Sequence, residues 1–491
     1  MPERATTMSR SEKSAEAVVG GGTRRRAERE GQSRDVDLGK ALHQMPGKPG
    51  GGGPGGGEAV EAPTHDEAES TVHDQTGWGV GDLLGQALSR ENMARAWKRV
   101  RANKGSAGVD RRTVRDTAEY LKTAWPNIRQ RLLDGTYKPE PVLRVSLPKP
   151  GGGTRDLGIP TVVDRLIQQA LLQVLQPILD PTFSEHSYGF RPGRSAQQAV
   201  QAAQRHVQAG YAVVVDVDLE KFFDRVNHDI LMGRMARRLS DKRVLGLIRR
   251  YLQADVLTHG VRLEREEGTP QGGPLSPLLA NLLLDEVDQE LERRGHRFVR
   301  YADDCNIYVK SHRAGHRVFA ALRKCYARLR LRVNEAKSAV AAVWGRKFLG
   351  YTVKRRSSGE VILGVAESAV KRVRDRLRTL TRVTVSRSLE QVAQDLQCLI
   401  PGWRVYFALA QTPTTFRRLD SWLRTRLRVL RLRQWRHASR IYQEMRRLGA
   451  SDHLARSVAS LRQGWWGSAH TGLRRVLTVR YFDHLGVPTF S

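Results

Sequence analysis

The chain has 491 residues, with 83 Lys and Arg against 51 Asp and Glu and a formal net charge of +32. A charge so far from zero predicts a polyanionic partner such as nucleic acid. We expect a cytoplasmic protein with no membrane partner, because no apolar run of about 18 residues and no secretory signal is present; three widely spaced cysteines also exclude a disulfide framework and a cysteine-based zinc site.

The first segment, residues 1–78, has the composition of a disordered tail. It contains glycine runs and many charged residues but few apolar side chains that could build a core. Folded structure is expected from about Gly79, because Leu83, Leu84 and Leu88 recur at helical spacing.

A glycine-rich loop lies between two cations, Lys149 and Arg155, directly after a predicted strand over 143–147. Backbone amides and cations at such a hairpin tip are suited to binding a triphosphate. A plain flexible turn is the alternative, because most glycine runs have no ligand.

Residues 213–219 (VVVDVDL) predict a buried strand. Because side chains alternate along a strand, Asp216 and Asp218 share one face with Val214. Two carboxylates on an apolar strand need partners. From this strand alone, pairing with nearby arginines and binding of a metal ion explain the pattern equally well.

Gln271 lies in a loop with Pro270, Gly272 and Gly273, before a predicted helix over 278–291. Glycine at this place allows the backbone to approach a ligand closely. The start of an ordinary helix, marked by proline, is the alternative.

Residues 301–304 (YADD) separate two short apolar runs and predict a strand–turn–strand hairpin, which we call the YADD hairpin. Asp303 and Asp304 place two carboxylates at its turn. Adjacent Asp residues are common in surface turns, but a rigid pair joined by a third carboxylate would suit metal-assisted phosphoryl transfer. Mg²⁺ prefers such oxygen ligands.

The C-terminal part is rich in arginine. From Ala366 onward, 24 Lys and Arg face 8 Asp and Glu, which favours phosphate contacts. A solvated face of a helix bundle is the alternative. The candidate RNA contacts lie beside a helical apolar stripe and are Arg417, Arg424, Arg428 and Arg431.

Taken in order, these segments resemble the motifs of reverse transcriptases encoded by bacterial group II introns. The similarity extends from about Gly79 to the C-terminus. The matching blocks are residues 157–161 with Asp164 and Arg165, 187–195, 218–224, 269–277, 301–304, 334–338 and 348–351.

The resemblance implies an α+β right-hand polymerase with fingers, a palm built on an antiparallel sheet, and an α-helical thumb. The implied divisions are a disordered tail (1–78), an N-terminal extension with fingers (79–200), a palm with interleaved fingers segments (201–364), a thumb or maturase X domain (365–447), and a basic C-terminal DNA-binding-like tail (448–491).

It also implies an RNA-directed DNA polymerase that uses deoxynucleoside triphosphates and two Mg²⁺ ions. The family pattern selects Asp218 over Asp216 as the metal ligand that joins Asp303 and Asp304 in catalysis. It places Phe222 under the sugar of the incoming nucleotide. The implied nucleotide-binding residues are Lys149, Arg155, Phe222, Gln271 and Lys337.

The implied partners are a group II intron RNA, whose splicing and mobility the protein assists, template RNA, and primer or target DNA. The absence of a cysteine cluster implies that the His-Asn-His endonuclease module of many relatives is missing. A splicing-only RNA-binding maturase is one alternative. A domesticated reverse transcriptase in phage defence or repair is another, and the oligomeric state stays open.

Overall fold

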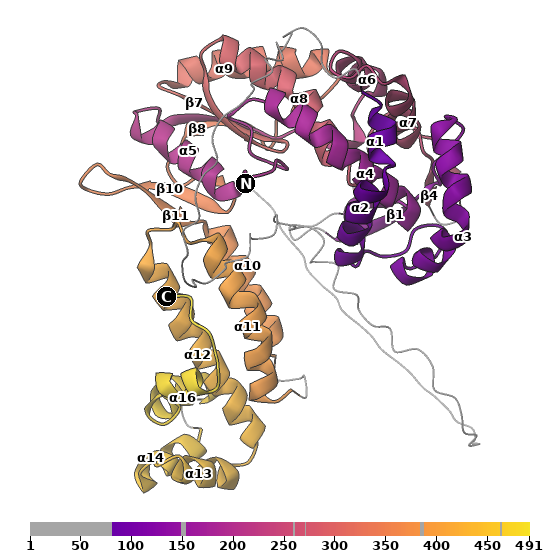
Figure 1. Ribbon diagram of the computed structural model, residues 1–491. Coiled ribbons are helices and arrows are strands. Elements are labelled where there is room, and N and C mark those ends of the chain that lie inside the picture. Colours follow the sequence, from indigo (N-terminus) through magenta and orange to yellow (C-terminus); the bar gives the residue numbers. More distant parts are fainter. Residues whose placement is uncertain (1–80, 149–153, 259–260, 271, 383–386, 462–463) are drawn as a thin grey trace, which may run out of the picture. The chain divides into compact units, whose positions relative to one another are not determined.

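The computed structural model describes residues 81–148, 154–258, 261–270, 272–382, 387–461 and 464–491. The predicted tail over 1–78, Lys149 and Gln271 lie outside these residues. Helices and sheets alternate along the described chain (Figure 1), which confirms the mixed α+β class. No helix of the described residues combines the length and apolar character that crossing a membrane requires.

The first part of the described chain combines helices with a four-stranded sheet of order β2-β1-β4-β5. Its strands are β1 (Val142–Pro148), β2 (Thr154–Ile159), β4 (Val256–Thr258) and β5 (Val261–Leu263). Its helices are α1 (Leu83–Ala87), α2 (Arg90–Ala102), α3 (Val114–Leu133) and α4 (Val162–Leu179). Antiparallel pairing from Leu143↔Ile159 to Pro148↔Thr154 confirms that the strands flanking the glycine loop form a hairpin.

A second four-stranded sheet has the order β6-β7-β3-β8 and carries the predicted carboxylates. Its strands are β3 (Val213–Val217), β6 (Arg297–Tyr301), β7 (Asp304–Val309) and β8 (Ala339–Ala342). β6 and β7 pair antiparallel up to Tyr301↔Asp304, so the predicted YADD hairpin is confirmed.

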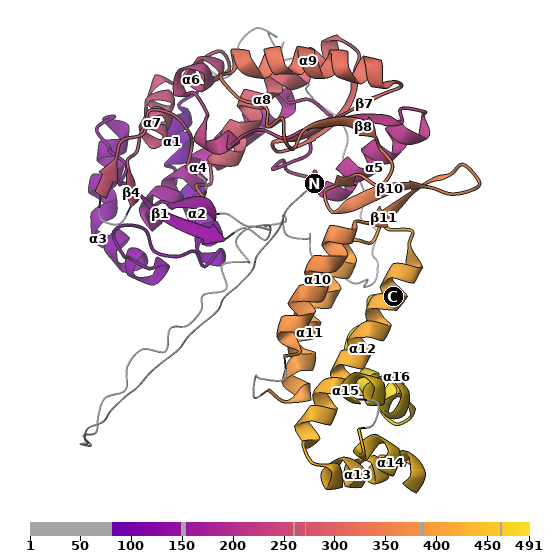
Figure 2. The same cartoon turned by 180° about the vertical axis from the view of Figure 1, so that it is seen from behind.

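The two faces of β3 enter different cores, as its alternation predicts. Val215 and Val217 belong to the largest hydrophobic cluster, whereas Val214 packs in another. α9 (His312–Arg328) lies along β3, β7 and β8 on one side (Figures 1 and 2), and α5 (Ala196–Gln208) contacts β6.

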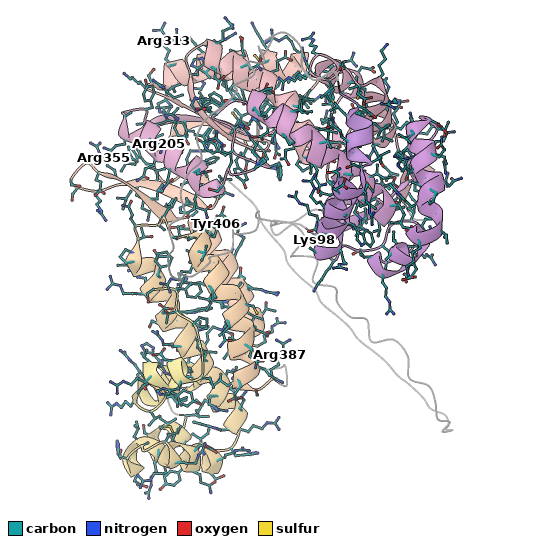
Figure 3. The ribbon with its side chains drawn as sticks, viewed as in Figure 1. Lys98, Arg205, Arg313, Arg355, Arg387 and Tyr406 are labelled. Carbon is teal, nitrogen blue, oxygen red and sulfur yellow. The ribbon has the colours of Figure 1, made fainter. Side chains whose placement is uncertain are left out.

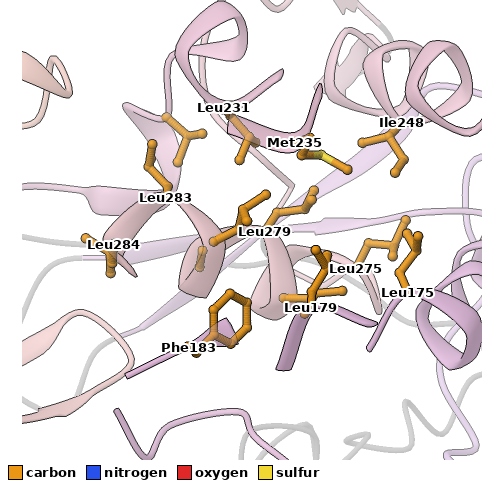
Figure 4. Packing of buried hydrophobic residues seen from close by; sticks show 14 of the residues in the cluster. Leu175, Leu179, Phe183, Leu231, Met235, Ile248, Leu275, Leu279, Leu283 and Leu284 are labelled. Carbon is orange, nitrogen blue, oxygen red and sulfur yellow. The ribbon is translucent and has the colours of Figure 1, made fainter. Parts of the chain in front are cut away.

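The largest cluster continues into the helices around α8 (Ser276–Arg293), which the sequence predicted over 278–291. Figure 4 shows its leucines interleaved with side chains of neighbouring helices, such as Leu279 with Leu231 and Met235. The neighbouring helices include α6 (His228–Ala236) and α7 (Lys242–Leu252). Such close packing makes α8 a rigid support for whatever lies on it.

The three-stranded sheet β11-β10-β9 precedes the C-terminal helices. Its strands are β9 (Lys347–Phe348), β10 (Tyr351–Arg355) and β11 (Val361–Val365). The helices that follow are α10 (Glu367–Leu380), α11 (Leu389–Tyr406), α12 (Pro413–Trp435), α13 (Ala438–Arg447), α14 (Asp452–Ala459), α15 (Gly464–Gly467) and α16 (Val479–His484).

These helices share one hydrophobic core, and it includes the last segment of the chain. Leu473, Phe482 and Phe490 are buried in the same cluster as Leu423 and Leu427 of α12. Described residues on both sides of the predicted division between 447 and 448 therefore pack in the same core, and the division itself stays a prediction.

Candidate active site

The strand register brings the predicted carboxylates into one neighbourhood. Val217 of β3 pairs with Cys305 of β7. Because the strands are antiparallel, the next residue, Asp218, falls opposite Asp304. The backbone of Asp218 is held on its other side, where its N–H donates to Ser338 Oγ at 3.0 Å and its carbonyl accepts from the Asn334 N–H at 2.8 Å.

The electrostatics agree with this placement. The pKa of Asp304 is raised to about 7, first by desolvation and then by the negative charges of Asp303, Asp216 and Asp218, while Lys347 opposes the rise. Asp304 is exposed, so water weakens the effect of desolvation, whereas the repulsion between the neighbouring carboxylates remains.

Carboxylate oxygens that repel one another form a donor set suited to a hard divalent cation. Within the described residues, no group of three or more His, Cys, Asp or Glu side chains is close enough to form a complete set of metal ligands. Two cations already compensate part of the charge. Lys337 Nζ lies 3.6 Å from Asp218 Oδ2, and Arg346 Nη2 lies 2.8 Å from Asp216 Oδ2. Asp216 is therefore paired with an arginine, one of the two explanations that the strand pattern left open.

A buried ion pair connects the YADD hairpin to α8. The guanidinium of Arg300 donates from Nε to both carboxylate oxygens of Asp288 on α8, at 2.8 and 2.9 Å, and both side chains have 0% exposure. Arg300 Nη1 also donates to Asn281 Oδ1 and to the Ala302 carbonyl, each at 2.9 Å. Ala302 has a φ of 59°, an unfavourable value for alanine. The hydrogen bond from Arg300 to the Ala302 carbonyl stabilises this turn conformation.

Gly189 packs against the same turn. A Cβ atom at this residue would lie 2.2 Å from the Ala302 nitrogen, so only glycine fits. Asn281 Nδ2 donates to the Gly189 carbonyl at 2.9 Å, and the Tyr188 N–H donates to the Arg300 carbonyl at 2.9 Å. The block at 187–195 is thus joined to the YADD hairpin.

The supporting roles of Arg300, Asp288 and Asn281 were not predicted from the sequence. The signal was present, because Arg300 interrupts the apolar run Phe298–Val299 of a strand, where a charge needs a buried partner. The partner itself lies on a different element and could not be selected without the fold.

The two aromatics in the short helix after Asp218 differ in exposure. Phe222 is 2% exposed and belongs to the largest core cluster, whereas Phe223 is half-buried at its edge. Their ring centroids are 5.0 Å apart in an edge-to-face arrangement. In this structure Phe222 is a core residue, and its place under the sugar of the nucleotide stays a prediction. Within the short helix Phe222–Asp224, Phe223 is the accessible ring.

Strand β2, which follows the first predicted nucleotide loop in the sequence, contacts the second loop. Gly272 has a φ of 135°, and a Cβ atom there would lie 2.5 Å from the Gly158 carbonyl of β2. Arg155 also lies on β2, opposite Leu147. The strand of Arg155 thus contacts the loop that contains Gln271, although Lys149, Gln271 and the side chain of Arg155 lie outside the described part of the chain.

The predicted arginine stripe of α12 is divided between surface and core. Arg428 is only 5% exposed, donates from Nε to the Leu477 carbonyl at 2.9 Å and lies over the Phe482 ring. Burial, followed by the charges of neighbouring arginines, lowers its pKa to about 10. Arg428 is therefore a structural residue, contrary to the predicted RNA contact.

The other three arginines of the predicted stripe differ in their exposure to solvent. Arg431 is half-buried and donates to the Tyr481 hydroxyl at 3.0 Å, so it too helps to hold the last helix. Arg424 is half-buried, and Arg417 is exposed. Arg417 is the member of the predicted stripe most accessible to a phosphate.

A different arginine cluster, missed in the sequence, surrounds Trp422 of α12. The guanidinium carbons of Arg374, Arg378 and Arg426 lie 5.6, 5.7 and 5.5 Å from the centre of its ring. Two of these arginines come from α10, so the cluster forms only when the helices pack. We call these four residues the Trp422 cluster.

Comparison with known proteins gives two family matches. Residues 147–353 match the model described as reverse transcriptase (RNA-dependent DNA polymerase), and residues 370–449 match the group II intron, maturase-specific domain. The first match includes β3, β6, β7 and the carboxylates. The second includes α11, α12 and the Trp422 cluster.

Individual relatives agree with these matches. Protein YkfC of Escherichia coli (strain K12) is 33% identical over 273 residues, which cover 47% of this chain and 71% of YkfC. The group II intron-encoded protein LtrA of Lactococcus lactis subsp. cremoris is 29% identical over 334 residues, 54% of this chain and 55% of LtrA. The chain thus spans about half the length of LtrA. A solved chain of the partial Cas6-RT-Cas1--Cas2 complex is 27% identical and covers 50% of this chain and 42% of that chain, with a TM-score of 0.34, too low to bear on domain arrangement.

The reverse transcriptase match over 147–353, which includes the YADD hairpin and Asp218, defines a nucleotidyl-transferring polymerase domain. The chain belongs to the family of group II intron-encoded reverse transcriptases with a maturase domain. Its enzyme class is RNA-directed DNA polymerase.

Proposed function

We propose that the protein copies RNA into DNA at the YADD hairpin, with Asp218, Asp303 and Asp304 as the catalytic metal ligands. The observation that carries the proposal is the β3–β7 register, which sets Asp218 opposite Asp304. The raised pKa of Asp304 supports it, because a divalent cation would relieve the repulsion between these carboxylates.

Two bound Mg²⁺ ions would lower the pKa of the primer 3′-hydroxyl and stabilise the pyrophosphate leaving group. The other steps depend on side chains of the protein. Lys149 and Arg155 neutralise the triphosphate as charge builds up on it. Gln271 meets the templating base pair and the nucleotide, and Lys337, already beside Asp218, reaches the same phosphates.

The right-hand arrangement is part of this proposal. The helices and sheet around β1 and β2 would be the fingers, the β6-β7-β3-β8 sheet the palm, and the helices from α10 onward the thumb. The cytoplasm is the proposed location, because the protein would meet newly made intron RNA there.

The maturase domain gives the second part of the proposal, the binding of a structured intron RNA to assist its splicing. Arg417 and the Trp422 cluster supply cations and an aromatic ring for phosphate and base contacts. Basic side chains also project from other elements, among them Lys98 of α2, Arg205 of α5, Arg313 of α9 and Arg355 of β10 (Figure 3). These are available for template RNA and for primer or target DNA.

Primer extension on an RNA template, with deoxynucleotides and Mg²⁺, tests both parts when it is paired with an RNA-binding assay. Asp303→Asn and Asp304→Asn should abolish DNA synthesis and leave RNA binding unchanged. A splicing-only maturase would show no synthesis even in the wild type. Sequencing the RNA that copurifies with the protein separates an intron partner from a domesticated enzyme, which would not retain one intron RNA.

A further inference from the structure

Phe190 is an aromatic residue that the fold holds in solvent. Its side chain is 49% exposed, although Gly189 before it and Arg191 after it are buried. It belongs to none of the hydrophobic clusters formed by the described residues. Its φ is 59°, in the left-handed region that bulky residues rarely adopt. Phe190 thus combines an exposed ring with an unfavourable backbone conformation, a combination typical of functional positions.

Both flanks of Phe190 are anchored. On one side, Gly189 abuts the Ala302 nitrogen and is bonded to Asn281. On the other, Arg191 Nε lies 2.9 Å from Asp180 Oδ1, and its Nη1 donates to the Ser187 carbonyl at 3.1 Å. These contacts fix the backbone, so the position of Phe190 is tied to the YADD hairpin.

We propose that Phe190 is a primer-positioning residue whose ring packs against the nucleotides at the 3′ end of the primer strand. The inference rests on the proposed polymerase function. The primer terminus must reach Asp303 and Asp304, and the chain at Gly189 touches the residue before Asp303.

Nucleic acid is the occupant that fits this place. Exposed aromatic rings bind nucleotides by stacking, with little dependence on sequence. Arg194, four residues further on, supplies a nearby positive charge, and its guanidinium carbon lies 5.6 Å from the Tyr188 ring. A ring and a cation on one anchored loop suit the sugar–phosphate backbone and the bases of a primer.

Phe190→Gly is the most informative variant, because it removes the ring and also relieves the backbone strain. We expect its melting temperature to equal or exceed that of the wild type, so that misfolding cannot explain a loss of function. Its KM for primer–template should rise roughly tenfold, the size of effect expected for a lost stacking contact, while kcat falls less. Phe190→Tyr should retain the wild-type KM.

Arg330→Gly is the matched control, since Arg330 is exposed and has a φ of 57°. It should relieve similar strain and leave the KM for primer–template within about twofold of the wild type. If the wild type extends primers but Phe190→Gly has an unchanged KM, the inference is wrong. A change in oligomeric state with an unchanged KM would overturn it in favour of a protein interface. If the wild type fails to extend primers at all, the proposed function fails first.

Discussion

Arg300 and Asp288 form a fully buried two-point ion pair that connects the catalytic hairpin to α8. The same guanidinium holds the Ala302 carbonyl, so the pair sets the geometry of the turn that presents Asp303. Removal of one member of such a pair leaves a buried charge without its partner and costs about 3–5 kcal/mol of stability.

Asp288→Asn should therefore lower the free energy of unfolding by several kcal/mol and reduce DNA synthesis. The double variant Arg300→Met/Asp288→Leu separates the two effects. It removes both charges and should recover much of the stability, but it cannot hold the Ala302 carbonyl, so synthesis should remain low. Chemical denaturation and primer extension measure the two quantities. Full recovery of synthesis in the double variant would show that the pair serves stability alone.

The different burial of Phe222 and Phe223 predicts which of the two rings could exclude ribonucleotides. Phe222→Ala should destabilise the fold by about 3–5 kcal/mol, because it empties a core position. Phe223→Ala should cost less stability. If an aromatic ring excludes the 2′-hydroxyl, the accessible Phe223 is the residue whose loss should permit ribonucleotide incorporation. Incorporation of ribonucleotides by Phe222→Ala alone would restore the original assignment to Phe222.

Arg155 is predicted to contact the triphosphate. Arg155→Ala should raise the KM for deoxynucleotides roughly tenfold or more, because a charge-assisted contact to phosphate is lost. Steady-state kinetics on a fixed primer–template measures it. Lys122→Ala is the control, since Lys122 forms an exposed ion pair with Glu119 and should not affect nucleotide binding. An unchanged KM in Arg155→Ala would remove this residue from the site.

The Trp422 cluster is predicted to bind RNA phosphates. The double variant Arg374→Gln/Arg378→Gln, in two arginines of α10 beside Trp422, should weaken binding of structured RNA and reduce the dependence of affinity on salt by about two counterions. Arg428→Gln should instead mainly lower stability, because Arg428 is buried against Leu477 and Phe482. Filter binding at several salt concentrations distinguishes these cases. Equal losses of RNA affinity in both variants would argue against a specific surface site.

The parts of this site that were predicted from sequence are those fixed by local pattern. Alternation along residues 213–219 placed Asp216 and Asp218 on one face, and the apolar runs around YADD predicted the hairpin. The errors and omissions depend on tertiary packing. Local pattern could not decide which of Phe222 and Phe223 turns inward, because they are adjacent in a short irregular helix.

The arginines of α12 also show that local sequence pattern cannot decide which side chains are buried. Helical periodicity places Arg428 on a polar stripe, but the segment near Leu477 and Phe482 packs over it, some 50 residues further along the chain. Likewise, α8 carries several acidic residues, and the sequence alone does not show that Asp288 is the one that pairs with Arg300. Contacts between distant segments are set by the whole fold, and a single sequence does not display them.

Asp218, and not its neighbour Asp216, is proposed to act with the YADD carboxylates. Asp218→Asn and Asp216→Asn, compared in primer extension on RNA with Mg²⁺, test it most directly, because both remove one charge from the same strand face. We predict loss of synthesis by a factor of about 10³ or more for Asp218→Asn and substantial synthesis for Asp216→Asn, which loses its ion pair with Arg346. Near-normal synthesis by Asp218→Asn would show that Asp218 is not a catalytic metal ligand.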